Sequence, residues 1–153
     1  MNNKLKWCRN QKNGLKLIEP NDNLAEEYYR NAEETLKMTR QTKDSASNMW
    51  LATHKYYTEY FISYSLLMKL GIKSEIHSCT IEIIRFLEEQ ELISFKLSET
   101  LESDKQLRID NQYYLKNKPV NIDFQKLSNL LLDVRNTIDN LKSEDIKKIR
   151  NLL

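Results

Sequence analysis

The stretch from Met49 to His77 constrains the fold more than any other part of this sequence, because its apolar and aromatic residues recur with helical spacing. One series repeats at alternating steps of four and three residues, which places its members on one helical face: Trp50, His54, Tyr57, Phe61, Tyr64 and Met68. A second series covers a neighbouring face: Met49, Ala52, Tyr56, Ser63, Leu67 and Leu70. A helix that is apolar around most of its circumference is buried. The sequence therefore predicts a central helix over about residues 46–70, ended by a left-handed Gly71.

Glycine and proline are scarce, with two of each in 153 residues. Turns and strand-rich folds use both residues, so their scarcity favours long helices joined by short loops. Periodicity and capping residues predict the other helices over about 23–42, from a cap at Ser74 through Leu87, over about 94–115, from Asn121 through Leu141, and from Ser143 to Leu153. The predicted fold class is all-α, a four- to five-helix up-and-down bundle with a short C-terminal helical extension.

The chain divides into three predicted segments. Residues 1–21 form a basic N-terminal arm, in which Asn13-Gly14 is a predicted tight turn. Residues 22–116 form the helical bundle, and residues 117–153 form C-terminal helices that pack on it. Hydrophobic residues make up 40% and charged residues 30% of the chain, as in a folded protein rather than a disordered one.

Charge, cysteine content and hydropathy indicate the class of partner and the cellular compartment of the protein. The formal net charge of +2 is too small to imply a nucleic-acid partner without a local basic patch. Cys8 and Cys79 are far apart in the sequence, and the chain does not begin with a secretory segment, so we expect reduced thiols. Lys55, Glu59 and Lys69 interrupt the central helix and argue against a membrane span. These features predict a cytoplasmic protein.

Several metal and cofactor chemistries do not fit the residues present. A di-iron site in a helical bundle needs Glu-x-x-His pairs, but Leu51 and Ser74 lie three residues before His54 and His77. Two cysteines and two histidines at these spacings make no zinc site. Two glycines in the whole chain leave no glycine-rich phosphate loop. We therefore expect neither a metal nor a cofactor.

The segment over about 94–115 carries polar residues on the face that should point inward. Leucines share this face with an acid, a base and an amide: Leu97, Leu101, Asp104, Arg108, Asn111 and Leu115. Polar groups beside core leucines are costly unless they have partners. The face is either a functional site or a structural ion pair between Arg108 and Asp104.

The stretch from Asp22 to Tyr114 resembles the HEPN superfamily of small helical prokaryotic proteins. The resemblance rests on Ala52-Thr53-His54-Lys55-Tyr56-Tyr57-Thr58-Glu59-Tyr60-Phe61, on the turn Leu66-Leu67-Met68-Lys69-Leu70-Gly71-Ile72-Lys73, and on His77-Ser78 opening the next helix. It implies a bundle that pairs into a homodimer and a minimal nucleotidyltransferase as partner, in a toxin–antitoxin-type module. Many members of this superfamily are metal-independent ribonucleases with an Arg-x4–6-His motif near the fourth helix.

That motif is absent from this sequence, because no arginine stands five to seven residues before His54 or His77. In one degenerate version, Arg108 is followed five residues later by Tyr113, a poor base at neutral pH since its ordinary pKa is about 10. A second version runs from Arg135 to Asn140 on the next helix. We interpret His54 and His77 as core or helix-end residues.

The first functional hypothesis is a HEPN-type dimer that binds RNA or a nucleotide around Arg108, Asp110, Tyr113 and Tyr114. Arg108 and Tyr113 are its candidate catalytic residues, with residual ribonuclease activity left open. An alternative is a non-catalytic interaction module whose heptad face, Phe124–Leu141, binds a partner or a second subunit. A further alternative is a helix-turn-helix DNA-binding regulator that depends on Arg85.

Overall fold

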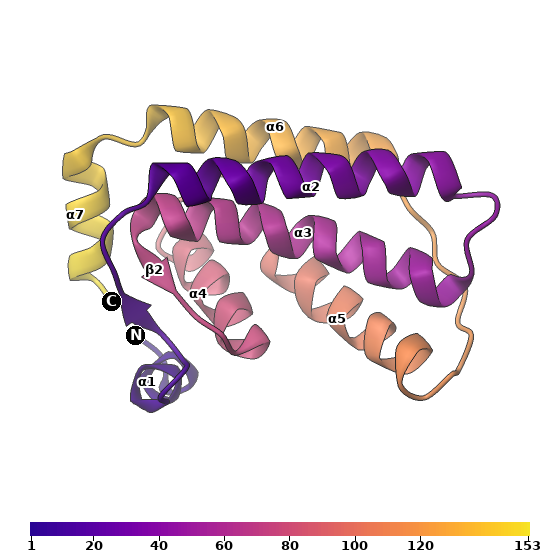
Figure 1. Ribbon diagram of the computed structural model, residues 1–153. Coiled ribbons are helices and arrows are strands. Elements are labelled where there is room, and N and C mark those ends of the chain that lie inside the picture. The colour runs from indigo at the N-terminus through magenta and orange to yellow at the C-terminus, as the bar shows by residue number, and fades with distance from the viewer.

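The computed structural model describes residues 1–153 and confirms an all-helical protein with one small sheet (Figure 1). Its elements are α1 (Asn3–Asn10), β1 (Lys16–Leu17), α2 (Asp22–Thr42), α3 (Asn48–Leu70), β2 (Ile72–Lys73), α4 (His77–Glu89), α5 (Ser98–Gln112), α6 (Phe124–Asn140) and α7 (Ser143–Asn151). No helix has both the length and the apolar character needed to cross a membrane.

The helices α2 and α3 form a long antiparallel hairpin (Figure 1), and both begin and end close to the predicted positions. The Asn21 side chain accepts a hydrogen bond from the Leu24 amide, which caps the start of α2. Ser47 caps α3 in the same way. Gly71 ends α3 at a φ of 67°, the left-handed conformation predicted for it.

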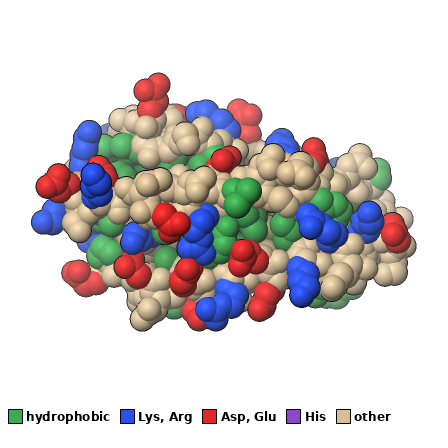
Figure 2. Space-filling view, turned by 90° about the horizontal axis from the view of Figure 1, so that it is seen from above, with side chains coloured by type: hydrophobic (Ala, Val, Ile, Leu, Met, Phe, Trp, Pro, Cys, Tyr) green, Lys and Arg blue, Asp and Glu red, His purple; other side chains and the backbone are tan.

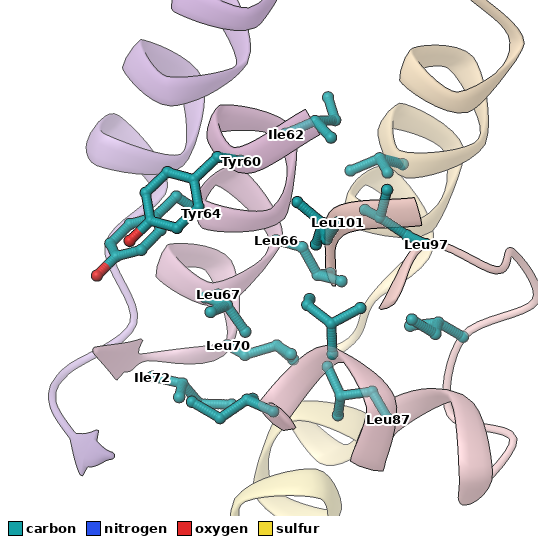
Figure 3. Close-up of a cluster of buried hydrophobic side chains, with 14 of the residues drawn as sticks. Tyr60, Ile62, Tyr64, Leu66, Leu67, Leu70, Ile72, Leu87, Leu97 and Leu101 are labelled. Carbon is teal, nitrogen blue, oxygen red and sulfur yellow. The ribbon is translucent and has the colours of Figure 1, made fainter. Parts of the chain in front are cut away.

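The central position of α3 is confirmed. Leucine, isoleucine and tyrosine side chains on several sides of α3 are fully buried, and Figure 3 shows some of them meeting side chains from α4 and α5. The apolar stripe of α6 closes the other side of the same core with Leu127, Leu131, Val134 and Ile138. Most of the heptad face over Phe124–Leu141 is therefore occupied by packing within the chain, so the alternative that this face binds a partner stays a prediction with little free surface to support it.

The bounds of α4 and α5 differ from the predicted ones, because polar side chains fix the loops beside these two helices. The helix α4 begins at His77, and Ser74 does not cap it; the Ser74 hydroxyl donates to the Ile76 carbonyl instead. The buried Glu88 carboxylate accepts hydrogen bonds from the Leu97 and Ser98 amides, which sets the start of α5. Leu115 has a φ of 50°, so the chain has left the helical conformation there.

The basic N-terminal arm is more ordered than predicted. Asn2 caps α1, and β1 pairs antiparallel with β2, with Leu17 opposite Ile72. Gly14 makes the turn between α1 and β1, where a Cβ would lie 1.8 Å from the Cys8 carbonyl oxygen. The arm thus packs along α4 and joins the end of α3.

Cys8 and Cys79 form a disulfide bond, which contradicts the expectation of reduced thiols. The two Cα atoms lie 5.6 Å apart because α1 packs against α4. The 71 residues that separate the cysteines in the sequence hid this proximity.

Candidate functional site

Arg108 is a buried arginine that faces the aromatic residues of α3. Its guanidinium carbon lies 4.9 Å from the Tyr56 ring centroid and 5.6 Å from that of Tyr57. No carboxylate lies within ion-pairing distance, and the one hydrogen bond is a long one of 3.4 Å from Nη1 to Gln112. Nε is buried without a partner. The predicted ion pair with Asp104 is wrong, because Asp104 pairs with Lys55.

His77 lies in the same cluster, although it belongs to a different helix. Its ring stacks on Tyr60 with centroids 4.3 Å apart, and its Nδ1 lies 2.6 Å from the Tyr56 hydroxyl. Tyr56 therefore contacts both Arg108 and His77. The cluster joins Tyr56 of α3, the first residue of α4 and Arg108 of α5. Motif spacing along the sequence does not reveal that both residues contact Tyr56, because His77 and Arg108 belong to different helices.

The surroundings of His77 determine whether its ring is charged and which ring nitrogen carries the proton. Burial lowers the pKa of His77, and the neighbouring Arg108 and Lys105 charges lower it further, so the ring is neutral at pH 7. Burial raises the pKa of Tyr56, which keeps the phenol protonated. Tyr56 is fully buried and its hydroxyl has no other partner, so it donates to His77 Nδ1. The remaining proton of the neutral ring is then on Nε2.

Two donors of this cluster have no hydrogen-bond partner within the chain and are not fully buried: His77 Nε2 and Arg108 Nη2. The cluster thus presents an N–H group and a guanidinium beside aromatic rings, without a competing carboxylate. Such a set has the chemistry to bind an anion, and the aromatic rings contact the face of the guanidinium.

The structure separates Asp110 from this cluster. Its carboxylate pairs with Lys118 at 2.5 Å and with Lys116 at 3.2 Å. The hydrogen bonds from Lys118 and then Gln106 lower the pKa of Asp110 to about 2, so it stays ionised and neutralised by lysines. Asp110 fixes the loop after α5 and contributes no free group to Arg108.

Tyr113 and Tyr114 project from the same loop into solvent, with exposed fractions of 65% and 67%. The Asn111 side chain holds the loop by bonding the backbone of Lys118 at both its amide and its carbonyl. The Lys116 ammonium lies 5.6 Å from the Tyr114 ring. The two tyrosines make an exposed aromatic step near the end of α5, and neither contacts Arg108.

The other candidates from the sequence have structural partners. Arg135 pairs with Glu26 at 2.8 Å and stacks on Tyr29, which ties α6 to α2. Arg85 pairs with Glu82 and Glu102, and most of α4 is buried, so α4 has no free basic face for DNA. His54 lies beside Trp50, and burial lowers its pKa.

The largest hollows of the surface are not lined by residues of the Arg108 cluster. One of about 780 Å³ lies between the end of α4 and α6, one of about 630 Å³ between α3, α5 and α6, and one of about 610 Å³ between the start of α2 and α7. The absence of a hollow of this size at the cluster suits a chain crossing the surface better than an enclosed small molecule. No group of three or more histidine, cysteine, aspartate or glutamate side chains is placed to hold a metal ion.

A search against models of protein families finds no match to this chain, and a search of curated protein sequences finds no similar protein.

Proposed function

We propose that this protein is a HEPN-type helical protein that binds RNA through the backbone phosphates, with Arg108 and His77 as the phosphate contacts. The observation that carries the proposal is the buried Arg108 guanidinium, which has no carboxylate partner. A buried charge without a counter-ion is costly, and a phosphate at Nη2 supplies one. Tyr113 and Tyr114 offer exposed rings on which bases stack.

Binding is favoured over cleavage by the proton on His77. A histidine that acts as the base on a 2′-hydroxyl needs a free lone pair facing the substrate. Here Nδ1 accepts from Tyr56 and Nε2 carries the proton, so the neutral ring donates to a phosphate oxygen. The protein is thus a nucleotide- or RNA-binding component with a degenerate ribonuclease motif.

The first experiment measures the affinity for a short, mixed-sequence single-stranded RNA by fluorescence anisotropy. We expect Arg108→Ala and His77→Ala each to weaken binding about tenfold, because each removes one hydrogen bond to a charged group. Arg30→Ala is the matched control, since Arg30 is an exposed arginine paired with Glu27 on α2. Equal affinities of wild type and Arg108→Ala, or no binding by either, would contradict the proposal.

The same proteins are tested for cleavage on a sequencing gel. We expect no Arg108-dependent products. Cleavage that His77→Ala abolishes would show that Nε2 is the free base, and the binding-only proposal would fail.

The remaining parts of the proposal rest on the resemblance of residues 22–114. They are a homodimer and a toxin–antitoxin-type pairing with a minimal nucleotidyltransferase, tested by co-purification with the product of the neighbouring gene. A nucleotidyltransferase partner implies a cytoplasmic location, where the Cys8–Cys79 bond would be reduced. Alkylation of free thiols at lysis, followed by mass spectrometry, tests that location.

A further inference from the structure

Of the three largest hollows, the one between α3, α5 and α6 alone is lined by a fully buried polar group that lacks a partner. Its volume of about 630 Å³ is typical of a small-molecule site. The hollow between α4 and α6 is lined by buried Glu88, but both Glu88 oxygens accept hydrogen bonds from the chain. No buried residue lines the hollow at α7. The hollow between α3, α5 and α6 therefore needs a physical explanation that the other two do not.

The buried lining of this hollow combines one carboxyl group with an apolar wall. Glu59 is 1% exposed, and the other buried residues of the lining are Phe95, Leu97 and Leu127. The exposed rim carries charges of both signs: Lys96, Lys126, Asp123 and Asp133. Figure 2 shows a similar mixture of acidic and basic side chains over one face of the molecule. The rim thus favours neither sign of charge, and the buried Glu59 decides which ligand fits.

The charges around Glu59 do not balance when its carboxyl group is ionised. The Lys55 ammonium contacts Asp104 and lies 3.7 Å from Glu59 Oε1. No other cation is within ion-pairing distance of either carboxylate. Two carboxylates therefore share one ammonium, and Glu59 Oε2 is buried without a hydrogen-bond partner. An unpaired buried carboxylate is costly, so this arrangement lacks one positively charged hydrogen-bond donor.

We propose that this hollow binds a small organic ammonium ion, whose charged group donates to Glu59 Oε2 and whose apolar body lies against Phe95, Leu97 and Leu127. An ammonium group supplies the missing charge and the missing donor together. A metal ion fits less well, because no cluster of three or more ligating side chains is present. The residues proposed to contact RNA do not line this hollow, so the two binding events are independent.

Binding of the ammonium ion should release a proton. Without the ligand, a proton on Glu59 balances the second carboxyl group, and burial followed by the Asp104 charge raises the pKa of Glu59. The ligand replaces this proton, which passes to solvent, so its affinity should rise with pH. An aliphatic amine stays charged over this range, because its ordinary pKa is about 10. The charged groups around Glu59 are Lys55 and Asp104 and, at the rim, Lys96, Lys126, Asp123 and Asp133.

The test is a titration with n-butylammonium chloride, followed by the amide ¹H–¹⁵N NMR spectrum of the protein. We expect the signals of Phe95, Leu97 and Leu127 to shift. Glu59→Gln should weaken binding at least about tenfold, because glutamine keeps the shape of the side chain but not its charge. Glu99→Gln is the matched control, since Glu99 is an exposed glutamate of α5 that does not line the hollow. The uncharged probe of the same length, 1-butanol, should bind at least about tenfold more weakly.

Each outcome decides the proposal. It is overturned if n-butylammonium shifts no signal of the hollow, if Glu59→Gln binds it as tightly as the wild type, or if 1-butanol binds equally well. The amide spectrum also verifies that each variant is folded. If Glu59→Gln is not, the wild type is titrated at about pH 5 and about pH 8. Tighter binding at the higher pH supports the proposal, and equal or weaker binding there overturns it.

Discussion

Glu59 is a buried carboxyl group in the middle of α3, with an exposed fraction of 1%. Its Oε2 has no partner if the group is ionised, and Asp104 lies beside it. Burial, and then the Asp104 charge, raise the pKa of Glu59 well above its ordinary value. The simplest arrangement is a protonated Glu59 that donates to Asp104, while the Lys55 ammonium pairs with Asp104 and lies 3.7 Å from Glu59 Oε1.

This shared proton predicts a pH dependence of stability. The folded protein keeps a proton that the unfolded chain releases above the ordinary pKa of glutamate, so the free energy of unfolding falls as pH rises from that value through the raised pKa. We expect Glu59→Gln to remove this fall, which amounts to at most about 1.4 kcal/mol per pH unit. Urea unfolding at about pH 5 and about pH 8 measures it. The exposed Glu99→Gln serves as control, and parallel curves for wild type and Glu59→Gln would refute the shared proton.

The end of α3 is in contact with the N-terminal arm and with α7. The Arg150 guanidinium of α7 donates to the carbonyl oxygens of Ile18, Leu70 and Gly71. These bonds satisfy carbonyls that the end of α3 leaves without helical partners, and they fasten α7 to the N-terminal arm. A Cβ at Gly71 would lie 2.2 Å from Arg150 Nη1 and 2.5 Å from the Ile18 carbonyl oxygen.

Gly71→Ala should therefore destabilise the protein by at least about 2 kcal/mol, from left-handed strain together with displacement of Arg150. Thermal or urea unfolding provides the measurement. Lys43→Ala is the matched control, because Lys43 ends α2 at a right-handed φ of −53°. A loss at Gly71 no larger than that at Lys43 would mean that the left-handed cap contributes little.

At the level of the whole molecule, the disulfide closes a loop between the N-terminal arm and α4 across 71 residues. Closing a loop of this length restricts the unfolded chain, and replacing both cysteines with serine should cost about 4 kcal/mol. Urea unfolding with and without a reductant tests this expectation. The reductant should lower the stability of the wild type to that of the double variant and leave the double variant unchanged. Equal stability in the absence of reductant would show that the bond does not contribute.

The parts of the fold that were predicted correctly depend on residues that are close together in the sequence. The extents of α2 and α3 follow from side-chain caps at Asn21 and Ser47, and from a glycine at the one helix end that requires a left-handed φ. The predicted extent of α5 was less accurate, because its ends are fixed by hydrogen bonds of Glu88 and Asn111 to the backbone of the adjoining loops. The hydrophobic periodicity of the sequence gives no information about such contacts.

The candidate site, like the fold, was predicted from the sequence only in part. The polar stripe on α5 pointed to Arg108, and the structure confirms that this arginine is buried. Asp110 lies on the same helix but pairs with lysines of the following loop instead. Whether two helices present residues to each other depends on their packing angle and on their rotation about their own axes. The sequence by itself therefore determined the all-helical fold, the extents of α2 and α3 with the cap at Asn21 and the end at Gly71, and the central place of α3. Only the tertiary structure decided that His77 and Arg108 both contact Tyr56, that Cys8 bonds Cys79, and that the apolar stripe of α6 is buried while part of α3 stays exposed.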